Sequence, residues 1–188
     1  MKKILILAML IMGIASIGEL SAKSAKLNIP QIKGATIDEE ALTRDAVRDY
    51  GMVSSRTKNQ SAALQAALDD MERRGGGNLL LPEGEYCFGE VYMRSNVQLR
   101  VSSKATLYPY RNDKTINVIM LNFARARKET KESDFIENCS VSCYDGDKYT
   151  VDYSDFAPSS SKEGLSKVRF AAARMVRNFT IADARMML

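Results

Sequence analysis

The spacing of apolar residues predicts one helix near the start of the globular part of the chain. Over residues 60–73 the apolar positions recur every three to four residues and form a single helical face, made of Ala63, Leu64, Ala67, Leu68 and Met71. Asn59 or Ser61 can cap the start of this helix. Three glycines at 75–77 can end it, because glycine tolerates positive φ angles.

After residue 77 the helical spacing disappears and short β-type runs follow, separated by turn residues. These runs are residues 79–81, 86–92, 97–101, 118–123, 135–141, 149–153 and 176–181. An asparagine followed by an apolar, any, and an apolar residue recurs at Asn78, Asn96, Asn117, Asn138 and Asn178. The separations are 18, 21, 21 and 40 residues, and 40 is about two steps of 20. Such a period predicts an all-β solenoid with asparagines stacked at one corner.

The two ends of this solenoid are predicted to differ. A first coil exposes its apolar interior and its strand edges unless another element covers them, so the helix at 60–73 is predicted to be a cap. After Ile181 no similar cap follows, and about five to six coils are counted. The chain is therefore expected to be truncated at its C-terminus and to self-associate through the uncapped coil. Near residue 158, where a coil is expected, residues 155–164 read instead as a polar loop, either a binding loop or a plain connector.

The first 18 residues are predicted to be a signal peptide. Lys2 and Lys3 precede an apolar run at 4–17, and Ser16-Ile17-Gly18 supplies the small side chains of Ser16 and Gly18 at a spacing suited to signal peptidase. This run is shorter than the roughly 20 apolar residues that span a bilayer, although an uncleaved anchor stays open as an alternative. The interpretation places the protein outside the cytoplasm, secreted or periplasmic, with no stable membrane insertion after cleavage. Residues 19–46 are predicted to be a lead-in segment and 47–188 the coils.

The amino-acid composition limits which catalytic and metal-binding sites the chain can form. The 188 residues are 45% hydrophobic and 27% charged, which is typical of a globular protein rather than a disordered one. The absence of His and Trp excludes Ser-His-Asp and Cys-His nucleophiles and His-ligated zinc. Removal of residues 1–18 lowers the net charge from +4 to +2, a balance too weak to predict a nucleic-acid partner. Cys87, Cys139 and Cys143 are odd in number, so their pairing stays open; buried thiols are favoured and no metal site is predicted.

Several motifs resemble the entry coils of the pectin-lyase-like superfamily. They are Asp49-Tyr50-Gly51, residues 59–68, residues 75–86 and residues 93–97. Residues 93–101, Val168-Arg169-Phe170 and residues 175–183 are in addition similar to the iota-carrageenase family. This resemblance implies a right-handed parallel β-helix and inverting hydrolysis of β-1,4 bonds in a sulfated galactan. Polygalacturonase-type hydrolases acting on pectin remain an alternative, as does a non-catalytic glycan-binding β-helix of the adhesin or tailspike kind.

The resemblance implies that the catalytic acids lie outside this chain. Related β-helix hydrolases place an acidic pair on central coils, downstream of the run at 178–183. Polygalacturonase motifs are absent too, since the chain has no Asn-Thr-Asp, Gly-His-Gly or Arg-Ile-Lys, and Asp69-Asp70 lies on the predicted helix. The chain is therefore expected to be the N-terminal part of a hydrolase and to be inactive alone.

The remaining acidic residues offer one weak catalytic pair. Asp145, Asp147, Asp152 and Asp155 lie within one short run. Inverting glycosidases need two carboxyl groups about 6.5–9.5 Å apart, and Asp145 and Asp147, two residues apart on a strand, would approach that separation. No cofactor is predicted, although Ca²⁺ binds oxygens of this kind, and turn chemistry explains the same residues equally well.

Arginines recur along the predicted coils and suit an anionic polysaccharide. A guanidinium group matches sulfate or carboxylate oxygens with two parallel hydrogen bonds. The predicted substrate-binding residues are Arg94, Arg100, Arg174 and Arg177. Ordinary solvated strand faces would explain the same residues without any ligand.

Overall fold

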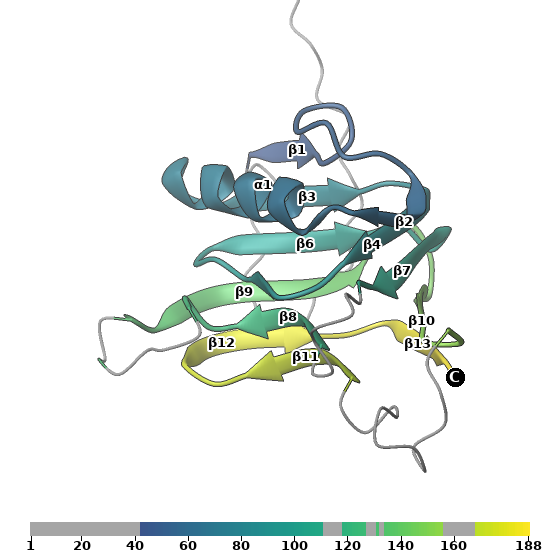
Figure 1. Ribbon diagram of the computed structural model, residues 1–188. Coiled ribbons are helices and arrows are strands. Elements are labelled where there is room, and N and C mark those ends of the chain that lie inside the picture. Colours follow the sequence, from purple (N-terminus) through teal and green to yellow (C-terminus); the bar gives the residue numbers. More distant parts are fainter. Residues whose placement is uncertain (1–41, 111–117, 127–130, 132–133, 156–167) are drawn as a thin grey trace, which may run out of the picture.

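A computed structural model describes residues 42–110, 118–126, 131, 134–155 and 168–188 (Figure 1). The predicted signal peptide at 1–18, residues 19–41 of the predicted lead-in and most of the polar loop expected at 155–164 lie outside these residues. Within the described part, no helix has the length and apolar character needed to cross a membrane.

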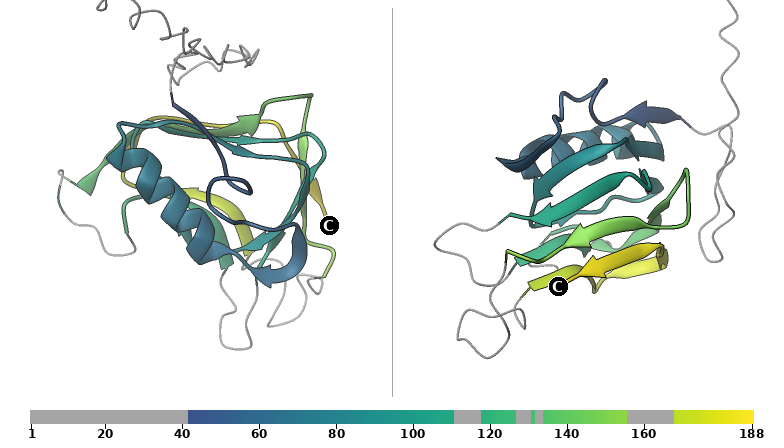
Figure 2. Two further views of the ribbon diagram at one scale, coloured as in Figure 1. Left: turned by 90° about the horizontal axis from the view of Figure 1, so that it is seen from above. Right: turned by 90° about the vertical axis from the view of Figure 1, so that its right-hand side faces the viewer.

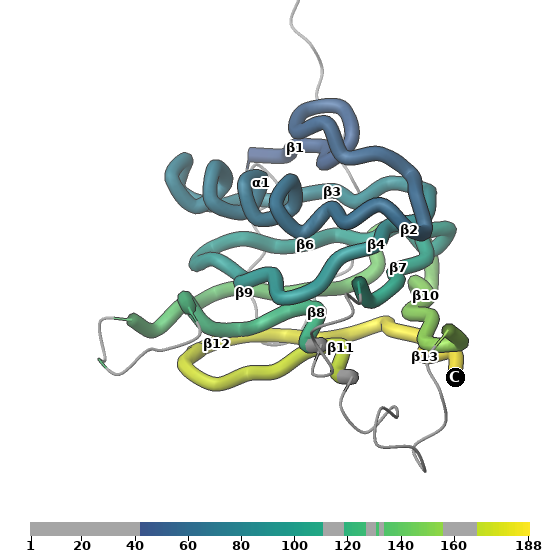
Figure 3. The backbone as a smooth tube through the Cα atoms, viewed as in Figure 1, coloured from purple at the N-terminus to yellow at the C-terminus, as the bar shows by residue number. Residues whose placement is uncertain are grey.

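The described strands form three parallel sheets that wind into a right-handed parallel β-helix, as the sequence predicted (Figures 1 and 3). Sheet A contains β1 (Thr43–Asp45), β3 (Gly77–Leu81), β6 (Val97–Val101), β9 (Ile136–Cys143) and β12 (Val176–Ile181). Sheet B contains β2 (Ser55–Asn59), β4 (Gly84–Phe88), β7 (Ala105–Pro109), β10 (Tyr149–Asp152) and β13 (Ala184–Met187). Sheet C contains β5 (Val91–Tyr92), β8 (Val118–Phe123) and β11 (Val168–Ala173).

The single described helix, α1 (Ser61–Arg73), takes the place of sheet C in the first coil, which runs β1, β2, α1. Its buried residues Leu64, Ala67, Leu68 and Met71 repeat at the expected spacing and face the core. The connection between β1 and β2 crosses over the end of the coil stack (Figure 2), and its Ala46 and Met52 are buried. The predicted helix is therefore present, but it covers the end together with this connection. β1 itself lies within the segment predicted as a lead-in and pairs with β3.

Three asparagines form the predicted ladder at the corner that leads into sheet A. Asn96, Asn138 and Asn178 have φ angles of 61°, 54° and 50°, a left-handed conformation that asparagine tolerates better than most residues. The Nδ2 of Asn138 donates to Oδ1 of Asn96 at 3.1 Å, and the Nδ2 of Asn178 donates to Oδ1 of Asn138 at 2.5 Å. At the equivalent position one coil earlier the chain has Gly76, so the ladder ends there. A Cβ at this position would lie 2.2 Å from the Asn96 carbonyl oxygen, so a side chain does not fit.

The uniform period of about 20 residues is wrong beyond the first step. Asn78 lies inside β3, opposite Gln98, and Asn117 directly precedes a sheet C strand, outside the described residues. Equivalent ladder positions are 42 residues apart between Asn96 and Asn138, and 40 apart between Asn138 and Asn178. The later coils are longer because extra chain joins their strands, so the coil expected near residue 158 does not exist as a separate step. An asparagine before an apolar run marks a turn into any strand, which explains the error.

Aligned apolar side chains fill the interior. One row crosses sheet A through Leu79, Leu99 and Val141, and another crosses sheet B through Tyr86, Leu107 and Val151. All three cysteines are buried free thiols. Burial raises the pKa of the Cys139 thiol to about 12, so it behaves as an apolar core residue.

Candidate functional site

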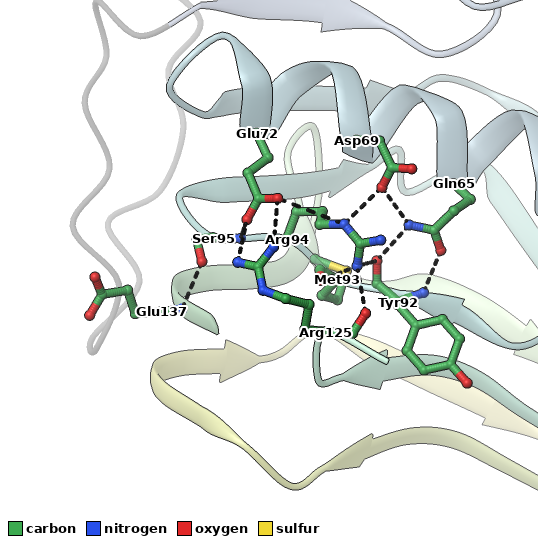
Figure 4. A network of polar contacts seen from close by, with 9 residues as sticks. All are labelled: Gln65, Asp69, Glu72, Tyr92, Met93, Arg94, Ser95, Arg125 and Glu137. Carbon is green, nitrogen blue, oxygen red and sulfur yellow. Dashed lines mark hydrogen bonds and ion pairs between the residues drawn. The ribbon is translucent and has the colours of Figure 1, made fainter. Parts of the chain in front are cut away.

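The first predicted substrate-binding residue, Arg94, is held in a network below α1 (Figure 4). Its Nε donates to Asp69 Oδ1 at 2.7 Å and lies 3.8 Å from Glu72 Oε2. Its Nη1 donates to the carbonyl oxygens of Met93 and Arg125, at 3.1 and 3.3 Å. The side chain is only 14% exposed. Arg94 therefore joins the helix to the coils below it, and its Nε and Nη1 groups are occupied by the protein.

The same network explains how a helix can stand in for a strand. The side-chain amide of Gln65 donates to the Tyr92 carbonyl at 3.1 Å and accepts the Tyr92 N–H at 2.8 Å (Figure 4). Glu72 accepts the Ser95 N–H at 3.0 Å and pairs with the Arg125 guanidinium at 3.0 Å. A helix has no free backbone groups along its side, so its polar side chains satisfy the edge of the next coil.

The second predicted residue, Arg100, lies on the outer face of sheet A and is completely buried. Its Nη1 donates to the hydroxyl oxygen of Ser142, and its Nε lies 3.5 Å from Asn78 Oδ1. Burial lowers its pKa to about 10, against the opposing effect of Asp183. A polymer in solution cannot reach this guanidinium without displacing what covers it.

The last two predicted residues, Arg174 and Arg177, are exposed. Arg174 Nη2 donates to the Ala126 carbonyl at 2.8 Å, and the Arg177 guanidinium carbon lies 4.6 Å from the centre of the Phe135 ring. Residues 168–188 contain four arginines and one aspartate, a net charge of +3. The accessible positive charge of the predicted set therefore gathers on the last described coil.

The weak catalytic pair occupies the turn between β9 and β10. Asp145 accepts the Ser102 hydroxyl at 2.7 Å and the Ser103 N–H at 2.5 Å, so it ties this turn to the equivalent turn one coil earlier. Burial raises the pKa of Asp145, but these hydrogen bonds outweigh that effect and the pKa lies below its ordinary value. This direction is opposite to that needed in a general acid. Asp147 is exposed in the same turn.

No group of three or more acidic, Cys or His side chains among the described residues is arranged to hold a metal ion. Ca²⁺ takes six to eight oxygen ligands, so the described geometry gives the calcium alternative no support.

One polar cluster on the outer face of sheet B was missed from the sequence. The Tyr108 hydroxyl donates to Glu85 Oε1 at 3.0 Å, and the Arg56 guanidinium carbon lies 4.8 Å from the centre of the Tyr108 ring. Arg56 Nη2 also contacts both carboxylate oxygens of Asp155, at 2.8 and 2.9 Å. Burial and the Glu85 hydrogen bond raise the pKa of Tyr108 to about 12, so the phenol stays neutral.

Strand alternation was the available signal for this cluster. Glu85 and Cys87 alternate with the inward-facing Tyr86, and Thr106 and Tyr108 alternate with the inward-facing Leu107. The contacts of Arg56 with Tyr108 and Asp155 join residues that lie 52 and 99 positions apart in the chain. No local pattern could have predicted those contacts.

Two curated relatives are iota-carrageenases. The chain is 30% identical to the enzyme of Alteromonas macleodii over 148 residues, which are 77% of this chain and 28% of that protein. It is also 30% identical to the enzyme of Zobellia galactanivorans over 143 residues, or 76% of this chain and 27% of that protein. The chain thus spans little more than a quarter of the length of these relatives. No family model matches the sequence.

Solved structures support the same assignment, and other similar proteins share the fold or a shorter stretch of sequence. An iota-carrageenase from A. fortis superimposes with a TM-score of 0.66 at 27% identity, over 81% of this chain and 31% of that one. A Yersinia enterocolitica exopolygalacturonase (TM-score 0.56, 13% identity, 78% of this chain and 35% of that one) shares the fold alone. The plasmin and fibronectin-binding protein A of Streptococcus pneumoniae is 38% identical over 64 residues, which are 33% of this chain and 9% of that protein. The predicted resemblance to iota-carrageenases is confirmed.

Proposed function

We propose that this chain, which is similar to iota-carrageenases, forms the N-terminal coils of a secreted hydrolase that acts on an anionic galactan. The reaction would be inverting hydrolysis of β-1,4 bonds. The observation that carries the proposal is 30% identity to an iota-carrageenase over 77% of the chain. The net charge of +3 on residues 168–188 supports an anionic polymer as the partner.

Within such an enzyme, the described coils would support and bind rather than catalyse. Arg94 is occupied by Asp69 and by backbone carbonyls, and Arg100 is buried. Asp145 is occupied by the turn of the preceding coil. Arg174 and Arg177 are the predicted binding residues that are exposed and could contact sulfate groups.

Affinity electrophoresis through gels containing iota-carrageenan, polygalacturonate or neutral agarose tests the binding part. We expect iota-carrageenan to retard the chain, with less retardation as salt rises. The double variant Arg174→Gln and Arg177→Gln should bind at least about tenfold more weakly, because a hydrogen bond to a charged group contributes ~1.5–3 kcal/mol. Arg48→Gln is the matched control, since Arg48 is an exposed arginine paired with Asp49. Equal retention by all three gels would contradict the proposal.

Release of reducing ends tests the catalytic part. We expect this chain alone to stay at background on both iota-carrageenan and polygalacturonate. Turnover that is abolished by Asp145→Asn or Asp147→Asn would overturn this expectation and assign catalysis to that pair. Preferential binding of polygalacturonate would favour the polygalacturonase-type alternative, for which the support is likeness of fold.

A non-catalytic binding protein is the second candidate. Identity of 38% over 64 residues to a streptococcal plasmin and fibronectin-binding protein favours it, because a third of this sequence resembles a protein named for binding. Two results together would support this candidate over the hydrolase. This chain would bind a glycan saturably, and a longer product that includes any coding sequence downstream in the genome would show no turnover.

A further inference from the structure

The turn after β8 receives an arginine side chain from the coil on each side of it. This β8 turn comprises residues 124–126. From the preceding coil, Nη1 of Arg94 donates to the Arg125 carbonyl oxygen at 3.3 Å. From the following coil, Nη2 of Arg174 donates to the Ala126 carbonyl oxygen at 2.8 Å. Two neighbouring carbonyl groups of one turn therefore hold the side chains of two arginines that lie two coils apart.

Helix α1 holds the same turn through the side chain of Arg125. Its Nη1 and Nη2 donate to Oε2 and Oε1 of Glu72 at 3.1 and 3.0 Å, the two-pronged geometry that arginine forms with a carboxylate (Figure 4). Glu72 also accepts the Ser95 N–H at 3.0 Å, so its carboxylate is itself fixed. The Glu72 side chain is 24% exposed and that of Arg125 is 40% exposed, so water screens this pair less than a fully exposed one. The helix therefore fixes a turn that lies two coils below it.

Arg174 depends on this turn for its orientation. Its own backbone N–H donates to the Phe123 carbonyl at 3.3 Å, at the end of the pairing between β8 and β11. Its side chain is exposed, and a long exposed side chain samples many rotamers. The Ala126 carbonyl restricts this motion by holding one nitrogen of the guanidinium group. An arginine that is held before it binds loses less conformational entropy when it contacts an anion.

We propose that Glu72 and Arg125 are positioning residues that hold the β8 turn so that Ala126 orients Arg174 toward a sulfate group. This inference rests on the proposed function, because it takes Arg174 as a contact of an anionic galactan. It gives α1 a role in binding besides that of a cover. It also reverses the sign expected from charge alone, since a carboxylate near a site for a polyanion would otherwise weaken binding.

Labelling with phenylglyoxal, which reacts with guanidinium groups, tests the positioning without any polymer. Peptide mass spectrometry of the full chain gives a separate labelling rate for each arginine. Glu72→Gln removes the charge that holds Arg125, so Arg174 should lose its fixed hydrogen bond and react at least about threefold faster. Arg185 is exposed on β13 and is the internal control, because its rate should not change. An unchanged rate at Arg174, or an equal rise at both arginines, would overturn the proposal.

The sign of the change in polymer binding tests the consequence for function. Glu72→Gln and Glu83→Gln each raise the net charge by one, and Glu83 lies in an exposed turn between β3 and β4, away from the β8 turn. In gels that contain iota-carrageenan, we expect Glu72→Gln to bind at least about threefold more weakly than the unaltered chain. Glu83→Gln should bind as tightly as the unaltered chain or slightly more tightly. Equal or tighter binding by Glu72→Gln would contradict the positioning.

Two further variants separate positioning from a purely structural effect. Arg125→Lys keeps the charge but loses the two-pronged geometry, so it should weaken binding as Glu72→Gln does, and it replaces that variant if Glu72→Gln does not fold. In a background of Arg174→Gln, Glu72→Gln should cause no additional loss, because Glu72 acts through Arg174. A full additional loss would overturn the proposal. If iota-carrageenan does not retard the unaltered chain, the proposed function fails, whereas the labelling rates still decide whether Glu72 positions Arg174.

Discussion

The two ends of the coil stack differ in how they treat apolar and charged side chains. At the N-terminal end the α1 residues Leu64, Leu68 and Met71 are fully buried on the inner face of the helix. At the C-terminal end Phe179, Ile181, Met186 and Met187 are 39–47% exposed. The arginines differ in the same way, since Arg73 and Arg74 pair with Asp70 whereas residues 168–188 carry four arginines and one aspartate.

Strand edges explain the contrast. Ser61, Gln65 and Glu72 bond to the backbone of the second coil, at Gly89, Tyr92 and Ser95, so the helix completes the edge chemically as well as covering it. Within the described residues, β12 pairs only with β9, and β13 pairs only with β10. A strand edge of this kind can pair with another chain. Covering a solenoid end thus requires both an apolar surface and a set of backbone partners.

The largest expected effect comes from a charge under the cap. Ala67→Asp places a carboxylate in a fully buried position and should cost about 4 kcal/mol or more of unfolding free energy. Ala66→Asp, on the exposed side of the same helix, is the matched control and should change stability by less than about 1 kcal/mol. Urea unfolding followed by circular dichroism measures both. Similar losses in the two variants would mean that α1 is not the cover.

The exposed coil should make this 188-residue chain self-associate. Each large apolar side chain removed from water contributes about 1.5–3 kcal/mol, and several are exposed together. Multi-angle light scattering should therefore show oligomers that Ile181→Lys with Met187→Lys converts to monomer. Glu83→Lys, in an exposed turn between β3 and β4 that lies away from this coil, should leave the oligomers in place. A monodisperse monomer of the unaltered chain would contradict the contrast between the ends.

A smaller effect is expected where a side chain replaces a strand. Gln65→Ala leaves the N–H and the carbonyl of Tyr92 without these partners, and should cost about 2 kcal/mol. Glu83→Gln is the control, because the Lys104–Glu83 pair at 3.5 Å is solvent-exposed and should contribute less than about 0.5 kcal/mol. Equal unfolding midpoints for the two variants would show that the edge of β5 needs no partner.

The smallest expected effect is on thermal stability at low pH. The Arg48 hydrogen bond and the Asp45 N–H lower the pKa of Asp49 to about 2. A carboxyl whose folded pKa is depressed contributes stability above its unfolded pKa of about 4 and loses it as pH falls toward 2. Asp49→Asn should therefore reduce the drop in thermal midpoint between pH 5 and pH 2.5, a range that covers most of this window. An unchanged drop would show that Asp49 makes no such contribution.

Local patterns predicted the elements better than their stacking. The helix face was predictable because Leu64, Leu68 and Met71 repeat at the helical spacing. The ladder was predictable at Asn96, Asn138 and Asn178 because asparagine suits a left-handed corner. The coil lengths were not predictable, since the extra chain between strands leaves no mark on the strands themselves.

The candidate site was less predictable because the environment decides what an arginine does. Arg94 and Arg174 look alike in the sequence, yet one is enclosed by Asp69 and backbone carbonyls while the other is exposed. Arg100 lies in an alternating strand pattern that predicts exposure, but it is buried. Only the arrangement of separate coils distinguishes these roles.

The unequal coils bear on how such a protein can change during evolution. β7 ends at Pro109 and β8 begins at Val118, whereas β10 ends at Asp152 and β11 begins at Val168, so both of these connections run from sheet B to sheet C and are longer than the connection between β4 and β5. The register of β8 with β11 is continuous in spite of these additions. A longer connection at this corner therefore changes the perimeter of a coil but not the register between neighbouring strands. New surface can be gained there while the packing of the core stays the same.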